Sequence, residues 1–258
     1  MTTSKSPRRV LRVAYDASCQ AFPAQRHRFS PKKFTQPQLA ACLVLKEFLR
    51  VDYRGLAEHL ADHREMTQAM DLKAIPHFTT FHKAAARLLR AAPARKLFDA
   101  VLARALREEV RKRRVPLAAV DGTGMESRHV SRYYVKRRSK TGTGTQETTY
   151  SKYPKVVLVT DCQSHLVLSA VPGRGPGSDL RQFRAALKEA AGRARIGTLL
   201  ADADFDAEWV HEEVRQEYGI RTIIPPERGR PSGKPPAGKW RRWMKGQFAR
   251  FKAEYGQR

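Results

Sequence analysis

The sequence predicts an α/β fold with a mixed β-sheet, preceded by a helical region. Three observations predict it. Apolar residues recur at helical spacing up to about Arg113. From Val115 the pattern changes to short apolar runs that end in Asp, Gly or Ser, as strands do. Beyond Pro172, helical and strand patterns alternate, which is typical of a sheet with parallel strands. We therefore expect two domains, residues 1–114 and residues 115–258.

The first domain is expected to consist of short helices. Thr35 and Pro37 suit a helix start, because a Thr side chain caps unbonded N–H groups and proline is tolerated in a first turn. The expected helices run from Gln36 to Leu49, from Arg54 to His63, from Thr79 or Thr80 to Leu89, and from Ala94 to about Arg113. Short helices with basic faces are typical of a helix-turn-helix-like DNA-binding region, but a plain helical bundle has the same pattern.

The second domain is expected to contain six strands and three helices. The strands are expected at Leu117–Val120, Arg132–Arg137, Lys155–Thr160, His165–Val171, Gly197–Ala201 and Arg221–Ile224. The helices are expected at Asp179–Gly192, Asp206–Tyr218 and Trp240–Tyr255. Two segments without apolar periodicity, Ser139–Ser151 and Pro225–Lys239, are expected to be loops.

The charge of the chain points to a polyanionic partner. Fifty Lys and Arg residues stand against 25 Asp and Glu residues, a formal net charge of +25. A positive excess of this size favours nucleic acid through phosphate contacts, and an anionic membrane surface is the weaker alternative. No apolar run approaches the roughly 20 residues that cross a bilayer. Three widely spaced cysteines argue against a disulfide framework, so we expect a reducing, cytoplasmic compartment.

Two aspartates follow apolar strands in the second domain. Asp121 comes directly after Leu117–Val120, and Asp202 comes directly after Leu199–Ala201. Because ligands of open α/β sheets bind outside the carboxyl ends of strands, the pair is a candidate catalytic site. Carboxylates are the ligands that Mg²⁺ or Mn²⁺ prefers, and such ions activate the attacking and leaving oxygens in phosphodiester cleavage. The alternative is structural, because an Asp after a strand commonly caps a turn, as Asp206 is expected to do ahead of its helix.

Other motifs are weaker. Gly122-Thr123-Gly124 is a fragment of a phosphate-binding loop without the lysine of a complete P-loop, and is expected to form a turn. His59 and His63 share a helix face at metal-compatible spacing, without a third ligand in sequence, so an exposed polar face is the simpler interpretation. Ser178-Asp179 is expected to cap the following helix.

The two aspartate blocks resemble those of bacterial insertion-sequence transposases of the DDE class. The segment Leu117–Thr123 is similar to the first catalytic block, and Leu199–Asp206 is similar to the second, whose usual form after the strand is Ala-Asp-x-Gly-Tyr-Asp. Here Asp204 replaces the usual Gly and Phe205 replaces the Tyr. Further similarities are the Gly177-Ser178-Asp179 segment and the upstream pattern of Pro76, Thr79 and Thr80.

The resemblance implies a ribonuclease H-like catalytic domain and a helical N-terminal region that binds the DNA ends of the element. It implies that Asp121 and Asp202 are the first two of three carboxylate ligands to Mg²⁺ or Mn²⁺. It also implies DNA strand cleavage and joining without a covalent enzyme–DNA link, transposon ends and target DNA as partners, a homodimer, no membrane, and a place at the nucleoid.

The third block departs from the family pattern. One subgroup of the family has a Tyr–Arg–Glu–Lys signature. Tyr255 and Arg258 match its first two positions, and the chain ends three residues short of the Glu. Glu254 and Glu227 do not keep the spacing. The resemblance therefore implies a C-terminally truncated transposase that is inactive alone. Two alternatives stay open: a DNA-binding fragment that competes with the full-length enzyme, and another ribonuclease H-like nuclease with a different third acid.

Overall fold

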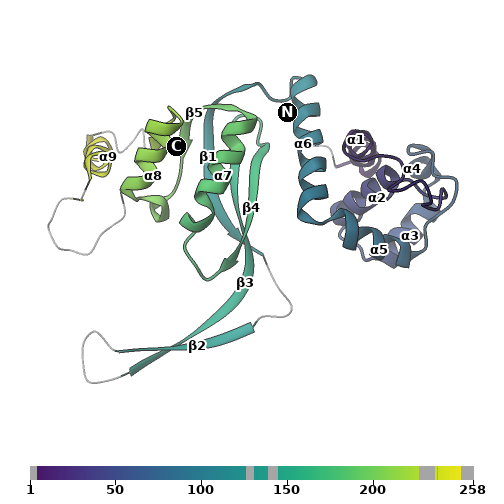
Figure 1. Ribbon diagram of the computed structural model, residues 1–258, viewed down its shortest axis with the longest axis horizontal. Helices are drawn as coiled ribbons and strands as arrows, with labels where there is room; N and C mark the ends of the chain where they lie inside the picture. Colours follow the sequence, from purple (N-terminus) through teal and green to yellow (C-terminus); the bar gives the residue numbers. More distant parts are fainter. Residues whose placement is uncertain (1–4, 126–130, 139–144, 227–235, 237, 251–258) are drawn as a thin grey trace. The chain divides into compact units, whose positions relative to one another are not determined.

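The structure is a computed structural model that describes residues 5–125, 131–138, 145–226, 236 and 238–250, of which 131–138 and 145–151 are described by their backbone alone. The chain divides into two compact units, Met1–Val110 and Arg111–Arg258 (Figure 1). We describe each unit by itself. No helix in the described ranges is long and apolar enough to cross a bilayer.

The first unit is helical. Its helices are α1 (Pro7–Ala21), α2 (Gln36–Leu49), α3 (Tyr53–Asp62), α4 (Arg64–Gln68), α5 (Phe78–Leu88) and α6 (Ala91–Arg107). The start of α2 is the predicted one: the Gln38 N–H donates to Thr35 Oγ1 at 3.3 Å, and the Thr35 N–H donates to Gln38 Oε1 at 2.9 Å. This reciprocal capping satisfies two N–H groups that a bare helix end leaves without a partner.

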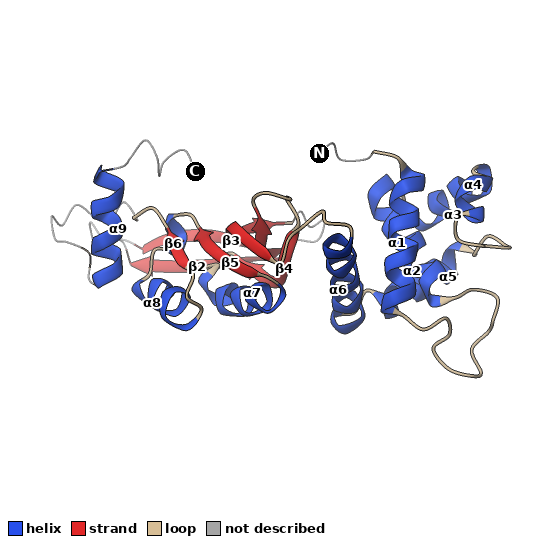
Figure 2. Cartoon of the chain, turned by 90° about the horizontal axis from the view of Figure 1, so that it is seen from above, coloured by secondary structure: helices blue, strands red, loops and turns tan. Residues whose placement is uncertain are grey.

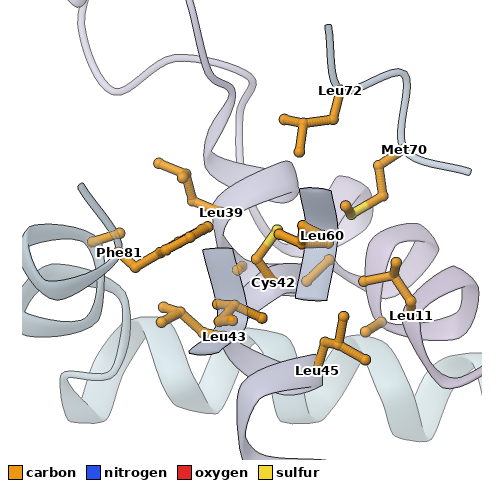
Figure 3. Packing of buried hydrophobic residues seen from close by; sticks show 14 of the residues in the cluster. Leu11, Leu39, Cys42, Leu43, Leu45, Leu60, Met70, Leu72 and Phe81 are labelled. Carbon is orange, nitrogen blue, oxygen red and sulfur yellow. The ribbon is translucent and has the colours of Figure 1, made fainter. Parts of the chain in front are cut away.

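The core of the first unit surrounds α2 (Figure 3). Leu39, Cys42, Leu43 and Leu45 of this helix are each at most 6% exposed. A helix buried on most of its circumference is the centre of its unit, with the other helices packed around it. Residues of α1, α3 and α5 close the cluster from the sides, among them Leu11, Leu60 and Phe81.

Several features of this unit differ from the expectations, and α1 and α4 are among them because neither helix is predicted. The helix α1 is not expected from the sequence, because its buried stripe holds one large apolar residue, Leu11, among Ala and Ser. The helix α5 begins at Phe78, because the ring of His77 accepts the capping hydrogen bond that a threonine is expected to accept. The helix α6 ends at Arg107 and does not continue to Arg113.

The second unit contains a mixed sheet. Its strands are β1 (Arg114–Gly124), β2 (Ser131–Arg138), β3 (Thr145–Asp161), β4 (Val167–Gly175), β5 (Arg195–Leu200) and β6 (Arg221–Ile223). Strand β3 lies between β4 and β1, and β5 and β6 follow on the far side of β1. The pairs β1–β5 and β5–β6 are parallel, and β1–β3 and β3–β4 are antiparallel. The mixed α/β class predicted from the sequence is confirmed.

The helices of the second unit are α7 (Leu180–Arg193), α8 (Glu208–Glu212) and α9 (Lys239–Arg250), with a short 3₁₀ turn η1 (Ala203–Phe205) and a π-helical turn η2 (Glu213–Glu217). Figure 2 shows α7 and α8 on the same face of the sheet. Their apolar residues, such as Phe183 and Val210, pack with Val120 and Val157 of the strands into one buried cluster. This packing fixes the carboxyl ends of β1 and β5 relative to each other.

The expected loop over Ser139–Ser151 is wrong in part. Strand β3 already begins at Thr145, and its first half pairs with β2 from Ser131↔Lys152 to Arg138↔Thr145. Figure 1 shows this two-stranded ribbon extending away from the rest of the sheet. Residues 139–144 lie outside the described ranges. Because β2 supplies a partner, a segment rich in Thr forms a strand without an apolar face of its own.

Candidate active site

The register of two parallel strands sets the spacing of the two predicted aspartates. Ala119 of β1 pairs with Leu200 of β5. Asp121 lies two residues beyond Ala119, and Asp202 lies two residues beyond Leu200. Because paired residues of neighbouring parallel strands lie at the same level of the sheet, Asp121 and Asp202 follow at a matching level, although β1 continues through Gly124. The Asp121 carboxylate is close enough to raise the pKa of Asp202. The structure therefore brings together the two residues on which the sequence-based site depends.

Asp121 is an exposed side chain in the last part of β1. Its Oδ1 accepts a hydrogen bond from the Gly122 N–H at 2.7 Å. Val120 beside it is 2% exposed and belongs to the apolar cluster under α7. Since successive side chains of a strand point to opposite faces, Asp121 points away from that cluster.

Asp202 begins a tight turn. Its Oδ1 accepts the Asp204 N–H at 3.1 Å, which caps η1. Burial raises the pKa of Asp202 above its ordinary value, and the Asp204 carboxylate raises it further. The Asp121 and Asp179 carboxylates act in the same direction, although the hydrogen bond from Asp204 opposes them. The site is therefore a place where negative charges repel each other, and a bound cation would relieve that repulsion.

A further carboxylate, Asp179, stands next to the pair. It occupies the N-cap position of α7, but its side chain makes no capping hydrogen bond; of the expected Ser178-Asp179 cap, Ser178 alone contributes, because its Oγ accepts the Leu180 N–H at 3.3 Å. The Asp179 Oδ1 instead accepts from the ammonium group of Lys155, which also donates to the Gly177 carbonyl. Lys155 is only 6% exposed. A buried ammonium group needs such partners, so this ion pair anchors the start of α7 to β3.

Gly122 makes room for this ion pair. A β-carbon at position 122 would overlap the Asp179 carboxylate. The glycine therefore lets α7 approach the strand that carries Asp121. The sequence predicts a turn at Gly122, Thr123 and Gly124, but β1 continues through all three, and no phosphate-binding loop forms in this described segment.

Asp206 does not cap α8, contrary to the prediction. The N-cap position belongs to Ala207, and the Asp206 carboxylate is 1% exposed and pairs with Arg241 of α9 at 2.8 Å. His211 Nε2 lies 3.6 Å from its other oxygen. The turn that holds Asp202 is thus connected to the last described helix by a charge pair in which Asp206 is buried and Arg241 is partly exposed.

Two further contacts hold α9 in place. The carboxylate of Glu208 accepts the Trp240 N–H at 2.9 Å and the Arg241 N–H at 3.0 Å, which caps the helix from a neighbouring element. The Arg215 guanidinium lies 4.5 Å from the ring centre of Trp240 and 4.9 Å from that of Trp243. The sequence does not predict these contacts, because nothing local in it links α8 to α9.

The remaining candidates do not assemble into a metal centre. The described residues contain no group of three His, Cys, Asp or Glu side chains arranged to hold a metal ion. The rings of His59 and His63 are 4.2 Å apart, and His63 Nδ1 is hydrogen-bonded to the His59 carbonyl at 2.8 Å. Tyr255, Arg258, Glu254 and Glu227, the residues on which the third block depends, lie outside the described residues.

Comparison with known proteins identifies the family of the second unit. The comparison with curated proteins found no match to this chain. The family model described as transposase DDE domain matches residues 113–253, just over half of the 258 residues. The matched range contains β1, β5 and both aspartates. The chain therefore belongs to the transposase DDE domain family.

Proposed function

We propose that this chain is an insertion-sequence transposase that cleaves and joins DNA strands with Mg²⁺ or Mn²⁺ held by Asp121 and Asp202. One observation carries the proposal: the register of β1 and β5 puts the backbone positions of Asp121 and Asp202 at a matching level of the sheet, within the residues of the family match. The order of the strands supports a ribonuclease H-like fold for this unit. The proposed assignment of residues 1–114 to binding of the element ends rests on their basic helices.

The donor set fits a hard divalent cation. Asp121 and Asp202 offer carboxylate oxygens, which Mg²⁺ and Mn²⁺ prefer over nitrogen or sulfur ligands. The raised pKa of Asp202 shows that its anionic form is disfavoured by burial and by its neighbours, and a divalent cation reverses that preference. When bound, the ion supplies the Lewis acid that activates the attacking and leaving oxygens of the phosphodiester.

The protein's own residues position this chemistry. The hydrogen bonds from the Gly122 and Asp204 N–H groups restrict the rotation of the two carboxylates. Asp179 and Lys155 hold the start of α7 against β1 and β3 behind Asp121. We propose that this pair positions the site and does not itself contact the reacting phosphate, because Lys155 is buried.

A third carboxylate completes the proposed site. By the family resemblance it follows Tyr255 and Arg258. Glu254 and Glu227 do not keep that spacing, and we propose them as substitutes, which would make the chain active despite the departure in its third block. The contacts of α9 with Asp206 and Glu208 hold α9 itself against the segment that follows Asp202. DNA of the element ends and of the target is the proposed substrate, bound by two copies of the chain.

The test is a strand-cleavage assay with labelled duplexes that carry the DNA flanking the coding sequence on both sides. We expect cleavage that requires Mg²⁺ or Mn²⁺ and is abolished by Asp121→Asn or Asp202→Asn. Asp62→Asn is the matched control, because Asp62 is an exposed aspartate of the other unit. Glu254→Gln and Glu227→Gln then show which acid is the third ligand. Cleavage that survives both site variants would contradict the proposal.

A second candidate function is DNA binding without cleavage, in competition with an intact transposase. The net charge of +25 favours it, because that charge supports binding to DNA whether or not the metal site is complete. The same assay separates the two functions. Tight, salt-dependent binding of the duplexes with no metal-dependent cleavage would support this second candidate over the first.

A further inference from the structure

Two neighbouring hollows lie on the helical unit. The first, of about 380 Å³, lies between the segment Gln25–Leu39 and helix α5. The second, of about 340 Å³, continues toward the start of α6. The two share Arg26, Gln36 and Arg87 in their linings, so they form one elongated depression. We call it the basic groove, after its six cationic residues: Arg26, Lys33, Lys83, Arg87, Arg90 and Lys96.

The charge of the basic groove is one-sided. Its described lining contains no Asp or Glu. In the described part of the chain, none of the six cations takes part in an ion pair. Five of the six are exposed, and Arg87 is partly buried. Clustered cations without counter-charges repel each other, and a polyanionic ligand removes that repulsion.

Helix α5 contributes one complete face to the basic groove. Thr80, Lys83 and Arg87 are three and four residues apart, so they lie on one side of the helix. The Nε atom of Arg87 is buried and has no hydrogen-bond partner among the described residues. Such a donor costs stability unless an acceptor is brought to it, and a phosphate oxygen is an acceptor that suits a guanidinium group.

We propose that the basic groove binds the phosphate backbone of duplex DNA, with the Thr80–Lys83–Arg87 face of α5 against one strand. The inference rests on the proposed function, because it takes DNA as the substrate. The elongated form of the groove favours a polymeric ligand over a single small anion. The hydroxyl groups of Ser30 and Thr80 and the amide of Gln25 are donors to phosphate oxygens of the kind seen in protein–DNA contacts. Contacts of this type position a duplex and do not read its sequence.

The experiment measures binding of the full chain to a fluorescent duplex of about 20 base pairs with unrelated sequence, in EDTA, by anisotropy over a range of salt concentrations. The groove variants are Lys83→Ala/Arg87→Ala and, because Arg87 is partly buried, a second variant Lys33→Ala/Lys96→Ala at exposed positions. Arg64→Ala/Lys73→Ala is the matched control, with two exposed cations removed from the same unit outside the groove.

We expect each groove variant to weaken binding about tenfold or more at low salt. We also expect each to reduce the slope of log affinity against log salt by about 0.9 for every phosphate that the variant no longer neutralises. The control should change affinity less than about threefold, as expected for charges that do not touch the DNA. Equal decreases in affinity for the groove and control variants would overturn the proposal. An affinity for a polyglutamate peptide of the same length as the duplex that equals the affinity for the duplex would also overturn it.

The groove inference and the proposed function can fail separately. If the chain binds DNA but the groove variants match the control, the groove inference fails and the proposed function stands. If the chain binds no duplex at all, both fail. If Asp121→Asn abolishes cleavage while DNA binding persists and depends on the groove, both are supported by separate residues.

Discussion

The Asp179 carboxylate lies where a β-carbon on Gly122 would be. The same carboxylate accepts a hydrogen bond from Lys155, a nearly buried residue of β3. Three elements, β1, β3 and the start of α7, therefore meet directly behind Asp121. This contact makes the geometry of the site depend on a glycine and a charge pair that take no part in the proposed chemistry.

Replacing Gly122 by Ala should destabilise the protein. The added methyl group collides with the Asp179 carboxylate, and forced overpacking of this kind costs about 1–3 kcal/mol. Urea denaturation measures the decrease in the free energy of unfolding. The matched control is Gly192→Ala in α7, where a β-carbon meets nothing within 4 Å. The control should be neutral or stabilising by about 0.4–1 kcal/mol, and equal destabilisation by both changes would contradict the packing described.

Removing the Asp179 charge should cost more than removing the whole ion pair. In Asp179→Asn the buried Lys155 ammonium group loses its counter-charge, a change that costs about 3–5 kcal/mol when the charge is well buried. In Lys155→Met/Asp179→Asn neither charge of this pair is left in the interior. A double-mutant cycle in urea should therefore be non-additive, with the double variant more stable than Asp179→Asn alone. Additive effects would mean that the two residues do not interact.

Asp202 should make the protein less stable as the pH rises. Burial and the neighbouring carboxylates raise its pKa in the folded state above the ordinary value of 3.8. The folded protein binds this proton more tightly than the unfolded chain does. The free energy of unfolding therefore decreases as the pH rises from that ordinary value through the folded-state pKa. Without divalent metal, Asp202→Asn should therefore raise the melting temperature at pH 7, and the gain should shrink near pH 3.8. A lower melting temperature at pH 7 would contradict this electrostatic account.

The Glu208 cap should control the order of α9. Glu208→Ala removes the acceptor of the Trp240 and Arg241 N–H groups, and the loss of a helix cap costs about 0.5–2 kcal/mol. Hydrogen exchange of the α9 amides should become faster in this variant. Glu212→Ala is the control, because Glu212 is an exposed residue of the same helix α8. Unchanged exchange in Glu208→Ala would show that the cap does not hold the helix.

The three thiols should differ in reactivity. Cys42 is fully buried in the core of the first unit, and burial raises its pKa to about 12. Cys19 is exposed and Cys162 is intermediate. A thiol reagent at pH 8 should label Cys19 first and should reach Cys42 only when the protein unfolds, because the thiolate is the reactive form. Loss of the first label in Cys19→Ser would identify Cys19 as the residue that reacts first. Labelling of Cys42 in the native protein would contradict the packing around α2.

The sequence predicts those features that depend on neighbouring residues. The capping pair of Thr35 and Gln38 is a local pattern, and Thr35 marks the start of α2 correctly. The apolar run before Asp202 predicts the end of β5 to within one residue, whereas Asp121 lies inside β1, which continues through Gly124 because β3 pairs with it. Both predictions need only residues that are close together in the sequence.

Contacts between segments that are far apart in the sequence could not be predicted. The Lys155–Asp179 pair joins residues 24 positions apart, and the Glu208 cap joins α8 to a helix 32 positions later. A charged residue alone does not show which other charge it will meet, so local caps are the natural prediction for Asp179 and Asp206. Strand β3 is longer than predicted because Thr145 to Ser151 has no apolar alternation, and its partner β2 lies in another segment.

The proposed function requires that Asp121 and Asp202 together bind a divalent metal ion. The most direct measurement is a titration of the full chain with Mn²⁺, followed by electron paramagnetic resonance of the unbound ion. We predict a site whose affinity falls at least about tenfold in Asp121→Asn and in Asp202→Asn, as expected when one of a few ligands is removed, and is unchanged in the Asp62→Asn control. Wild-type affinity in both site variants would contradict the account.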